Sequence, residues 1–174
     1  MTNVFLVGPM GSGKSAVGRQ LALRLGLRFI DSDEEIRART GVDIPYIFER
    51  EGEAGFRQRE AEVIDALTRE HGVLIATGGG AILDPGSRAR LRERGRVVYL
   101  RTSVDQQLAR TRRSNDRPLL ENPDPRGTLA RLFEQRAPLY LEVAEIVIDT
   151  DGRKVKSVVD QVCRELEKMP DASS

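Results

Sequence analysis

The stretch that most constrains this chain covers residues 8–15 and reads GPMGSGKS. It matches the pattern G-x-x-x-x-G-K-[ST] at every fixed position. The apolar run Val4–Val7 precedes it, and apolar residues follow at near-helical spacing, at Val17, Leu21 and Leu25. The order strand, glycine-rich turn, helix predicts a loop whose backbone N–H groups surround an anion at a helix N-terminus. The alternative is a glycine-rich turn that binds nothing.

The side chains of this loop have expected roles in binding a nucleotide. Lys14 would reach the β- and γ-phosphates, and the hydroxyl of Ser15 would be a ligand of Mg²⁺. The sequence therefore predicts that ATP and Mg²⁺ bind here. The residues expected to contact the phosphates are consecutive: Gly11, Ser12, Gly13, Lys14, Ser15 and Ala16.

Length and composition predict a single domain over residues 1–174. With 28 basic and 27 acidic residues the formal net charge is +1, so no overall field attracts the chain to nucleic acid or to a membrane surface. A lone cysteine, Cys163, permits no internal disulfide, and no signal peptide or membrane-length apolar run is present. We expect a cytoplasmic monomer. The only histidine, His71, is read as structural, which argues against a histidine-based metal site.

Strand-like and helix-like segments alternate along the chain. The expected strands are residues 4–7, 27–30, 73–76, 97–100 and 146–148; the expected helices are 14–25, 34–40, a short one near Pro45, then 53–70, 85–94, 104–112, 127–142 and 155–169. This alternation predicts an α/β fold with a parallel sheet covered on both faces. Such sheets bind ligands beyond the carboxyl ends of their strands. Residues 114–126 contain three prolines and are expected to form a mobile loop.

Two carboxylates follow the second expected strand, at Asp31 and Asp33. In an extended segment, side chains two apart point the same way. One carboxylate could hold Mg²⁺ through water, and the other could accept the proton of a hydroxyl nucleophile. The alternative is helix capping, since Ser32 and Asp33 precede the helical stretch Glu34-Glu35-Ile36; the two roles can coexist.

Arg57 and Glu60 lie three apart on one expected helix face. An arginine directed into the crevice would pair with an anionic group of the acceptor, and Glu60 could orient it. A solvated surface pair is the alternative. The nearby Phe48 and Phe56 are expected in the core, with lining of an acceptor pocket as the alternative.

Three successive glycines, Gly78, Gly79 and Gly80, follow the third expected strand. They suggest that backbone approaches a hydroxyl-rich ligand closely, although a tight turn remains possible. In the 114–126 loop, Arg117 is expected to act as a lid residue that neutralises the transferring phosphoryl group. Arg136 would complete a clamp on a carboxylate with Arg57.

Together these motifs resemble the shikimate kinase family, and the resemblance covers residues 4–162. The segments that carry it are GPMGSGKS, Asp31-Ser32-Asp33, Phe56-Arg57 with Glu60, the three glycines, Arg117-Pro118-Leu119-Leu120 and Arg136-Ala137-Pro138-Leu139-Tyr140. The resemblance implies a three-layer P-loop NTPase fold like that of nucleoside monophosphate kinases, with a five-stranded parallel sheet in the order 2-3-1-4-5. It also implies phosphorylation of the 3-hydroxyl of shikimate by ATP, in the route to chorismate and the aromatic amino acids.

The resemblance assigns roles to individual residues. Shikimate would be bound by Asp33, Arg57, the three glycines and Arg136, with both arginines on its carboxylate. Asp33, Lys14 and Arg117 would carry the catalysis, and Ser15, with Asp31 through water, would hold Mg²⁺. Arg110 and Arg153 match segments on the adenine side. The substrate-binding helical insert would be residues 33–60 and the lid residues 112–126.

Two other functions stay open on the sequence. Another small-molecule kinase of this fold, acting on gluconate or a nucleoside monophosphate, would share the phosphate loop but is not expected to combine the triple glycine with Arg57 and Arg136. A non-catalytic nucleotide-binding module would leave the acidic pair and the arginines without a role.

Overall fold

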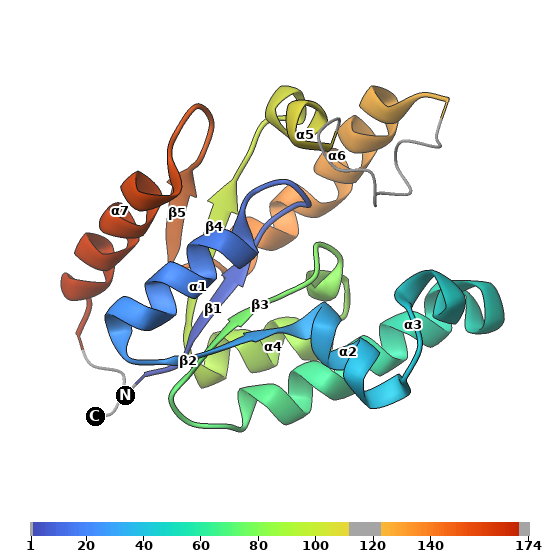
Figure 1. The fold of residues 1–174 in the computed structure, drawn as a ribbon, viewed down its shortest axis with the longest axis horizontal. Helices are drawn as coiled ribbons and strands as arrows, with labels where there is room; N and C mark the ends of the chain where they lie inside the picture. The colour runs from blue at the N-terminus through green and yellow to red at the C-terminus, as the bar shows by residue number, and fades with distance from the viewer. Residues whose placement is uncertain (1, 112–122, 171–174) are drawn as a thin grey trace.

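A computed structural model of the protein describes residues 2–111 and 123–170. Its centre is a five-stranded parallel sheet in the order β2-β3-β1-β4-β5 (Figure 1). The strands are β1 (Val4–Val7), β2 (Arg28–Asp31), β3 (Val73–Ala76), β4 (Arg96–Arg101) and β5 (Ile146–Asp149). The α/β class and the predicted strand order are both confirmed. Because β1 lies between β3 and β4, its carboxyl end opens where a ligand crevice is expected.

Helices connect these strands and cover the sheet. They are α1 (Lys14–Leu25), α2 (Ser32–Thr40), α3 (Ile44–Thr68), the short 3₁₀ helix η1 (Ala81–Leu83), α4 (Pro85–Arg94), α5 (Val104–Thr111), α6 (Pro125–Val143) and α7 (Val155–Glu167). Helix α3 is kinked at Gly52, whose φ of 74° is not helical. The short helix expected near Pro45 and the helix expected from residue 53 are therefore both present, on either side of this kink. Figure 1 shows α2 and α3 extending to one side of the sheet.

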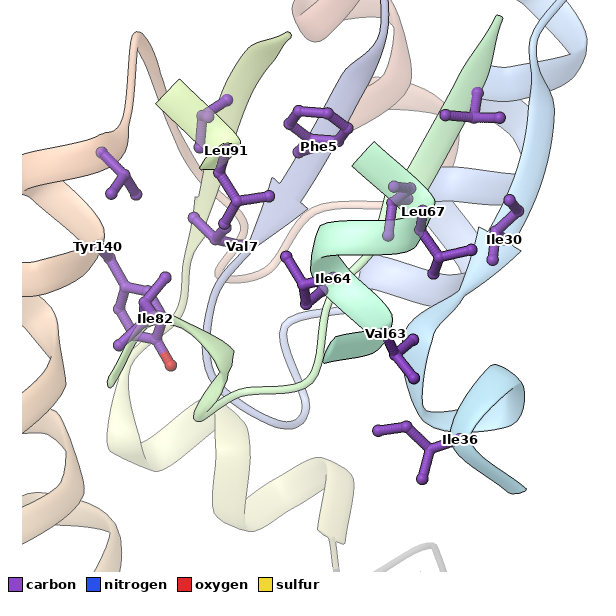
Figure 2. Packing of buried hydrophobic residues seen from close by; sticks show 14 of the residues in the cluster. Phe5, Val7, Ile30, Ile36, Val63, Ile64, Leu67, Ile82, Leu91 and Tyr140 are labelled. Carbon is purple, nitrogen blue, oxygen red and sulfur yellow. The ribbon is translucent and has the colours of Figure 1, made fainter. Parts of the chain in front are cut away.

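Alternating side chains of the central strand divide the core into two parts. Phe5 and Val7 of β1 belong to a cluster shared with α3, α4 and α6, which Figure 2 shows from close by. Val4 and Leu6 point to the opposite face and pack with α1 and α7. Continuous apolar strands buried on both faces explain why the sequence pattern placed β1 and β3 at their observed bounds.

The junction of β2 and α2 differs from the expectation of an extended segment. The Asp31 carboxylate accepts hydrogen bonds from the backbone N–H groups of Asp33 and Glu34, so the helix begins at Ser32 and not at Glu34. Asp33 therefore stands in the first turn of a helix, and strand alternation is the wrong reason for pairing it with Asp31. A side chain does cap this helix, but it is that of Asp31, whereas the capping alternative had placed the cap at Ser32 or Asp33.

The expected loop at 114–126 also needs correction at its end. Pro125 and Arg126 belong to the first turn of α6, which Asp124 caps through a hydrogen bond from the backbone N–H of Gly127. Helix starts tolerate proline because the missing N–H has no partner within the helix there. Arg117 and the Arg117-Pro118-Leu119-Leu120 segment lie outside the described residues.

One carboxylate ties α3 to α4. Asp65 accepts hydrogen bonds from Arg94 and Arg69 and forms an ion pair with Arg90. The hydrogen bonds from Arg94 and Arg69 lower the pKa of Asp65 to about 2. The arginines of α4 are thus partly engaged within the protein. Within residues 2–111 and 123–170, no helix is long and apolar enough to cross a membrane.

Candidate functional site

A cleft of ≈ 660 Å³ lies at the carboxyl ends of β1, β2 and β3, as the sheet topology requires. Most of the residues expected to bind a substrate or cofactor line it, although they come from six separate segments of the chain. They are Gly11, Gly13, Lys14, Ser15, Ala16, Asp31, Asp33, Arg57, Gly78, Gly79, Gly80, Arg110 and Arg136. The fold therefore brings the predicted phosphate loop and the predicted acceptor residues to a single cavity.

The phosphate loop passes from β1 to the N-terminus of α1. Gly13 precedes the helix with a φ of 88°, a conformation that glycine adopts without a steric penalty. The ammonium of Lys14 donates to the carbonyl oxygens of Gly8 at 2.5 Å and Pro9 at 2.8 Å, and its side chain also lines the cleft. The positive end of the helix and the lysine thus face the same space. Ser12 is buried in the loop.

Two side chains of α5 hold this loop from its outer side. The amide of Gln107 donates to the carbonyl oxygen of Met10 at 2.9 Å, and the guanidinium of Arg110 donates to the carbonyl oxygen of Gly11 at 2.5 Å. With these carbonyls turned outward, loop N–H groups are left to face an anion. Gln107 is absent from the sequence-based site because nothing local marks a contact with a residue 97 positions away.

The acidic residue Asp31 meets the phosphate loop directly. The hydroxyl of Ser15 donates to Asp31 Oδ2 at 2.9 Å, while Asp31 Oδ1 caps α2. This pairing puts a hydroxyl and a carboxylate oxygen side by side at the phosphate end of the cleft. Mg²⁺ in phosphoryl-transfer sites uses one or two such protein oxygens together with phosphate oxygens and water. In the parts of the chain that the structure describes, no cluster of three or more histidine, cysteine or acidic residues could hold a metal by itself.

Asp33 lines the same cleft as Asp31. Burial raises the pKa of Asp33, the negative charge of Asp31 raises it further, and the nearby charges of Lys14, Arg37 and Arg57 oppose that shift. A carboxylate with a raised pKa is a stronger base than one in water. A carboxylate of this kind could accept a proton from a hydroxyl group bound in the cleft.

Arg57 and Glu60 form a buried ion pair. Arg57 Nη1 donates to Glu60 Oε1 at 2.8 Å, and Glu60 is only 3% exposed, so the solvated surface pair is excluded. Burial raises the pKa of Glu60, and the charge of Arg57 opposes that shift. Some buried polar atoms here have no hydrogen-bond partner among the described residues: Arg57 Nε, Glu60 Oε2 and Arg136 Nε. The two arginine nitrogens among them are donors, and buried donors without a partner are suited to a ligand that brings acceptors.

The three glycines leave room for these side chains. A Cβ on Gly78 would lie 2.8 Å from Asp33 Oδ1, and a Cβ on Gly80 would lie 2.5 Å from the guanidinium carbon of Arg57. A Cβ on Gly79 would meet Arg136 Nη1 at 3.5 Å. A tight turn is present, because the N–H of Ala81 donates to the carbonyl of Gly78, but none of the three glycines has a positive φ, so this turn does not by itself require glycine. The close approach was predicted, but its first partners are the protein's own charged groups.

Some expectations fare differently. Phe56 is buried as expected, but Phe48 is 36% exposed, so its assignment to the core is wrong. Both rings line the cleft, which is the alternative that the sequence left open. The ring centroids lie 4.7 Å apart, which makes Phe48 the outer half of an aromatic pair. Arg153 does not line the cleft; its guanidinium bonds to Gln161, to Ser157 and to the carbonyl oxygen of Asp149. Its role at the adenine stays a prediction.

Comparison with known proteins identifies the family of this chain. The family model described as "Shikimate kinase" matches residues 10–167. A shikimate kinase of Halorhodospira halophila is 56% identical over 97% of this chain and 96% of its own length, and one of Pseudomonas entomophila is 52% identical over 98% and 99%. The solved shikimate kinase of Acinetobacter baumannii in complex with shikimate superposes with a TM-score of 0.92, with 46% identity over 98% of this chain and 96% of that one. The chain therefore belongs to the shikimate kinase family.

Proposed function

We propose that this protein transfers the γ-phosphoryl group of ATP to the 3-hydroxyl of shikimate, giving shikimate 3-phosphate and ADP on the route to chorismate. The observation that carries the proposal is the shared cleft: Lys14 of the phosphate loop and the arginine pair Arg57 and Arg136 line the same cavity, with Asp33 among them. Two guanidinium groups suit a carboxylate, and the phosphate loop suits a triphosphate. A small hydroxy acid fits between them.

At the acceptor end of the cleft, positively charged groups are held in position before the acceptor binds. Glu60 fixes one guanidinium nitrogen of Arg57, while Arg57 Nε and Arg136 Nε stay buried without a hydrogen-bond partner in the described part of the chain. We propose that the carboxylate of shikimate supplies their acceptors, and that Asp33 and the three glycines bind its hydroxyls. A fixed ring presents one hydroxyl to the phosphorus, which removes much of the entropic barrier to reaction.

At the nucleotide end, the loop from Gly11 to Ala16 would bind the phosphates, with Lys14 on the β- and γ-phosphates and Arg110 beside them. Ser15 and Asp31 would hold Mg²⁺, which neutralises phosphate charge when bound. Asp33 orients the hydroxyl nucleophile and takes its proton as the bond to phosphorus forms. Arg117 would neutralise charge on the transferring group, with residues 112–126 as the lid.

We further propose a single domain that acts as a cytoplasmic monomer, with residues 33–60 as the substrate-binding insert and without nucleic acid or membrane partners. The near-neutral charge and the projection of α2 and α3 from the sheet support these assignments (Figure 1).

The test is shikimate-dependent release of ADP in the presence of Mg²⁺, run beside quinate, gluconate and a nucleoside monophosphate. We expect turnover with shikimate well above turnover with the others. Turnover with gluconate or a nucleotide instead would favour the other kinases of this fold. Binding of ATP without turnover of any acceptor would favour a non-catalytic module. Lys14→Ala serves as the inactive control.

A further inference from the structure

The backbone of the triple glycine is held at several points. The hydroxyl of Ser32 accepts a hydrogen bond from the N–H of Gly78 at 3.1 Å, and the carbonyls of Gly78 and Gly80 accept hydrogen bonds within η1. The carbonyl of Gly79 accepts a hydrogen bond from the hydroxyl of Tyr140 at 2.5 Å. All three carbonyls and the first N–H of this stretch are thus engaged by the protein.

Two donors remain. Among the described residues, no acceptor is hydrogen-bonded to the N–H of Gly79 or of Gly80, and both glycines line the cleft. Buried or half-buried N–H groups are seldom left without a partner, so a ligand is expected to supply one. The direction in which these two groups point therefore matters for acceptor binding.

We propose that Tyr140 is a positioning residue, which fixes the direction of the Gly80 N–H toward the acceptor. The carbonyl of Gly79 and the N–H of Gly80 belong to one peptide unit, which is planar and trans, so the two groups point in opposite directions. By holding the carbonyl, the Tyr140 hydroxyl turns the N–H away from α6. Glycines on both sides of this peptide offer little resistance to rotation, so an outside anchor is needed.

Tyr140 is well placed to be such an anchor. It is 2% exposed, its ring lies 4.9 Å from that of Tyr99, and Figure 2 shows it extending from α6 toward the segment that carries Ile82. Burial raises the pKa of Tyr140, so the hydroxyl keeps its proton and remains a donor at neutral pH.

The position of Tyr140 on α6 links it to the arginine clamp. Tyr140 follows Arg136 by four residues, and residues at this spacing share a helix face. One rigid helix thus carries both a cation for the acceptor's carboxylate and the hydroxyl that directs a donor to the acceptor's ring. This inference rests on the proposed function, because it assumes that the acceptor is a polyhydroxy acid.

The first test compares Tyr140→Phe with Tyr99→Phe. Both changes remove one tyrosine hydroxyl from the same ring pair, but in the described part of the chain the hydroxyl of Tyr99 makes no hydrogen bond. We expect Tyr140→Phe to raise the dissociation constant for shikimate roughly three- to tenfold, as loss of one hydrogen bond predicts, with the KM for ATP unchanged. Tyr99→Phe should change neither. Measurements are made at a temperature where thermal melts show both variants folded.

The second test uses shikimate analogues that each lack the 4- or the 5-hydroxyl. If Tyr140 directs an N–H to one ring hydroxyl, the penalty of Tyr140→Phe disappears for the analogue without that hydroxyl and persists for the other. Equal penalties for all ligands would indicate a general structural role and overturn the proposal, as would wild-type binding by Tyr140→Phe. Failure of the wild-type protein to bind or phosphorylate shikimate would refute the proposed function separately.

Discussion

The guanidinium of Arg57 occupies the space that a side chain on Gly80 would need. A Cβ on Gly80 would lie 2.5 Å from the Arg57 guanidinium carbon, and Glu60 holds the same guanidinium through a hydrogen bond of 2.8 Å. Arg57 is therefore confined between a glycine of one segment and a buried carboxylate of its own helix. Its position is set before any acceptor binds.

Gly80→Ala should displace Arg57 while leaving the fold intact, because the end of a long side chain can move where backbone cannot. We expect the KM for shikimate to rise at least tenfold and the KM for ATP to change little. Gly79→Ala is the matched comparison, since its Cβ would meet Arg136 at an ordinary 3.5 Å. Steady-state kinetics with each substrate varied in turn provides the measurement. An equal loss in both variants, or an equal loss for both substrates, would contradict this account.

Two carboxylates touch Arg57, and they should differ greatly in importance. Glu60 is buried at 2.8 Å, whereas Glu53 approaches Arg57 Nε only to 3.6 Å and is 64% exposed. Removing one partner of a buried ion pair leaves an uncompensated charge, but an exposed pair contributes little. Glu60→Ala should weaken shikimate binding tenfold or more, and Glu53→Ala less than about twofold. Titration calorimetry with shikimate would decide, and equal effects would remove Glu60 from the clamp.

Asp33→Asn should abolish most turnover and also stabilise the free protein. Burial and Asp31 raise the pKa of Asp33, so the fold favours the protonated form and the ionised form at pH 7 costs stability. Removing the charge should therefore raise Tm at pH 7, and the gain should shrink as pH falls through the raised pKa. The rate should fall by about 10²- to 10⁴-fold, as loss of a general base predicts. A lower Tm at pH 7 would contradict the assigned shift.

Asp65 should have the opposite pH dependence. Its pKa is lowered to about 2 from 3.8 by the hydrogen bonds from Arg94 and Arg69. The stability that it contributes is therefore complete above pH 3.8 and is lost as pH falls toward 2. Asp65→Asn should lower Tm at pH 7, and the difference from the wild-type protein should vanish near pH 2. A constant difference across this range would show that packing, not charge, ties α3 to α4.

Sequence patterns predicted the sheet because its signals are local. Apolar runs such as Val4–Val7 read as strands buried on both faces, and glycine ended α1 at the predicted residue. The β2–α2 junction was predicted less well. Whether Asp31 extends a strand or caps a helix depends on whether its carboxylate bonds to the N–H groups of the following residues, and the sequence does not decide this. The 3₁₀ helix η1 was missed, since three residues give no periodicity.

At the candidate site, too, the sequence predicted what local signals mark and missed contacts between distant residues. Charged residues and glycines could be chosen from the sequence because their chemistry is unusual there. Gln107 could not, because it acts on a distant backbone carbonyl and nothing in its local sequence marks that contact. Tyr140 belongs to the segment from Arg136 that carries the family resemblance, but its hydrogen bond to the carbonyl of Gly79 could not be predicted. The partners of the three glycines were hidden for the same reason. Only the folded chain brings Asp33, Arg57 and Arg136 against them.

The mutual fit of Gly80, Arg57 and Glu60 limits how this enzyme can be redesigned. Replacing Arg57 alone, to admit an uncharged sugar, would leave a bare carboxylate in the interior and an empty space beside the glycine. A retargeted variant therefore needs a neutral residue at 60 and a larger one at 80 in the same step, so a search that changes single positions one at a time would discard the useful combination.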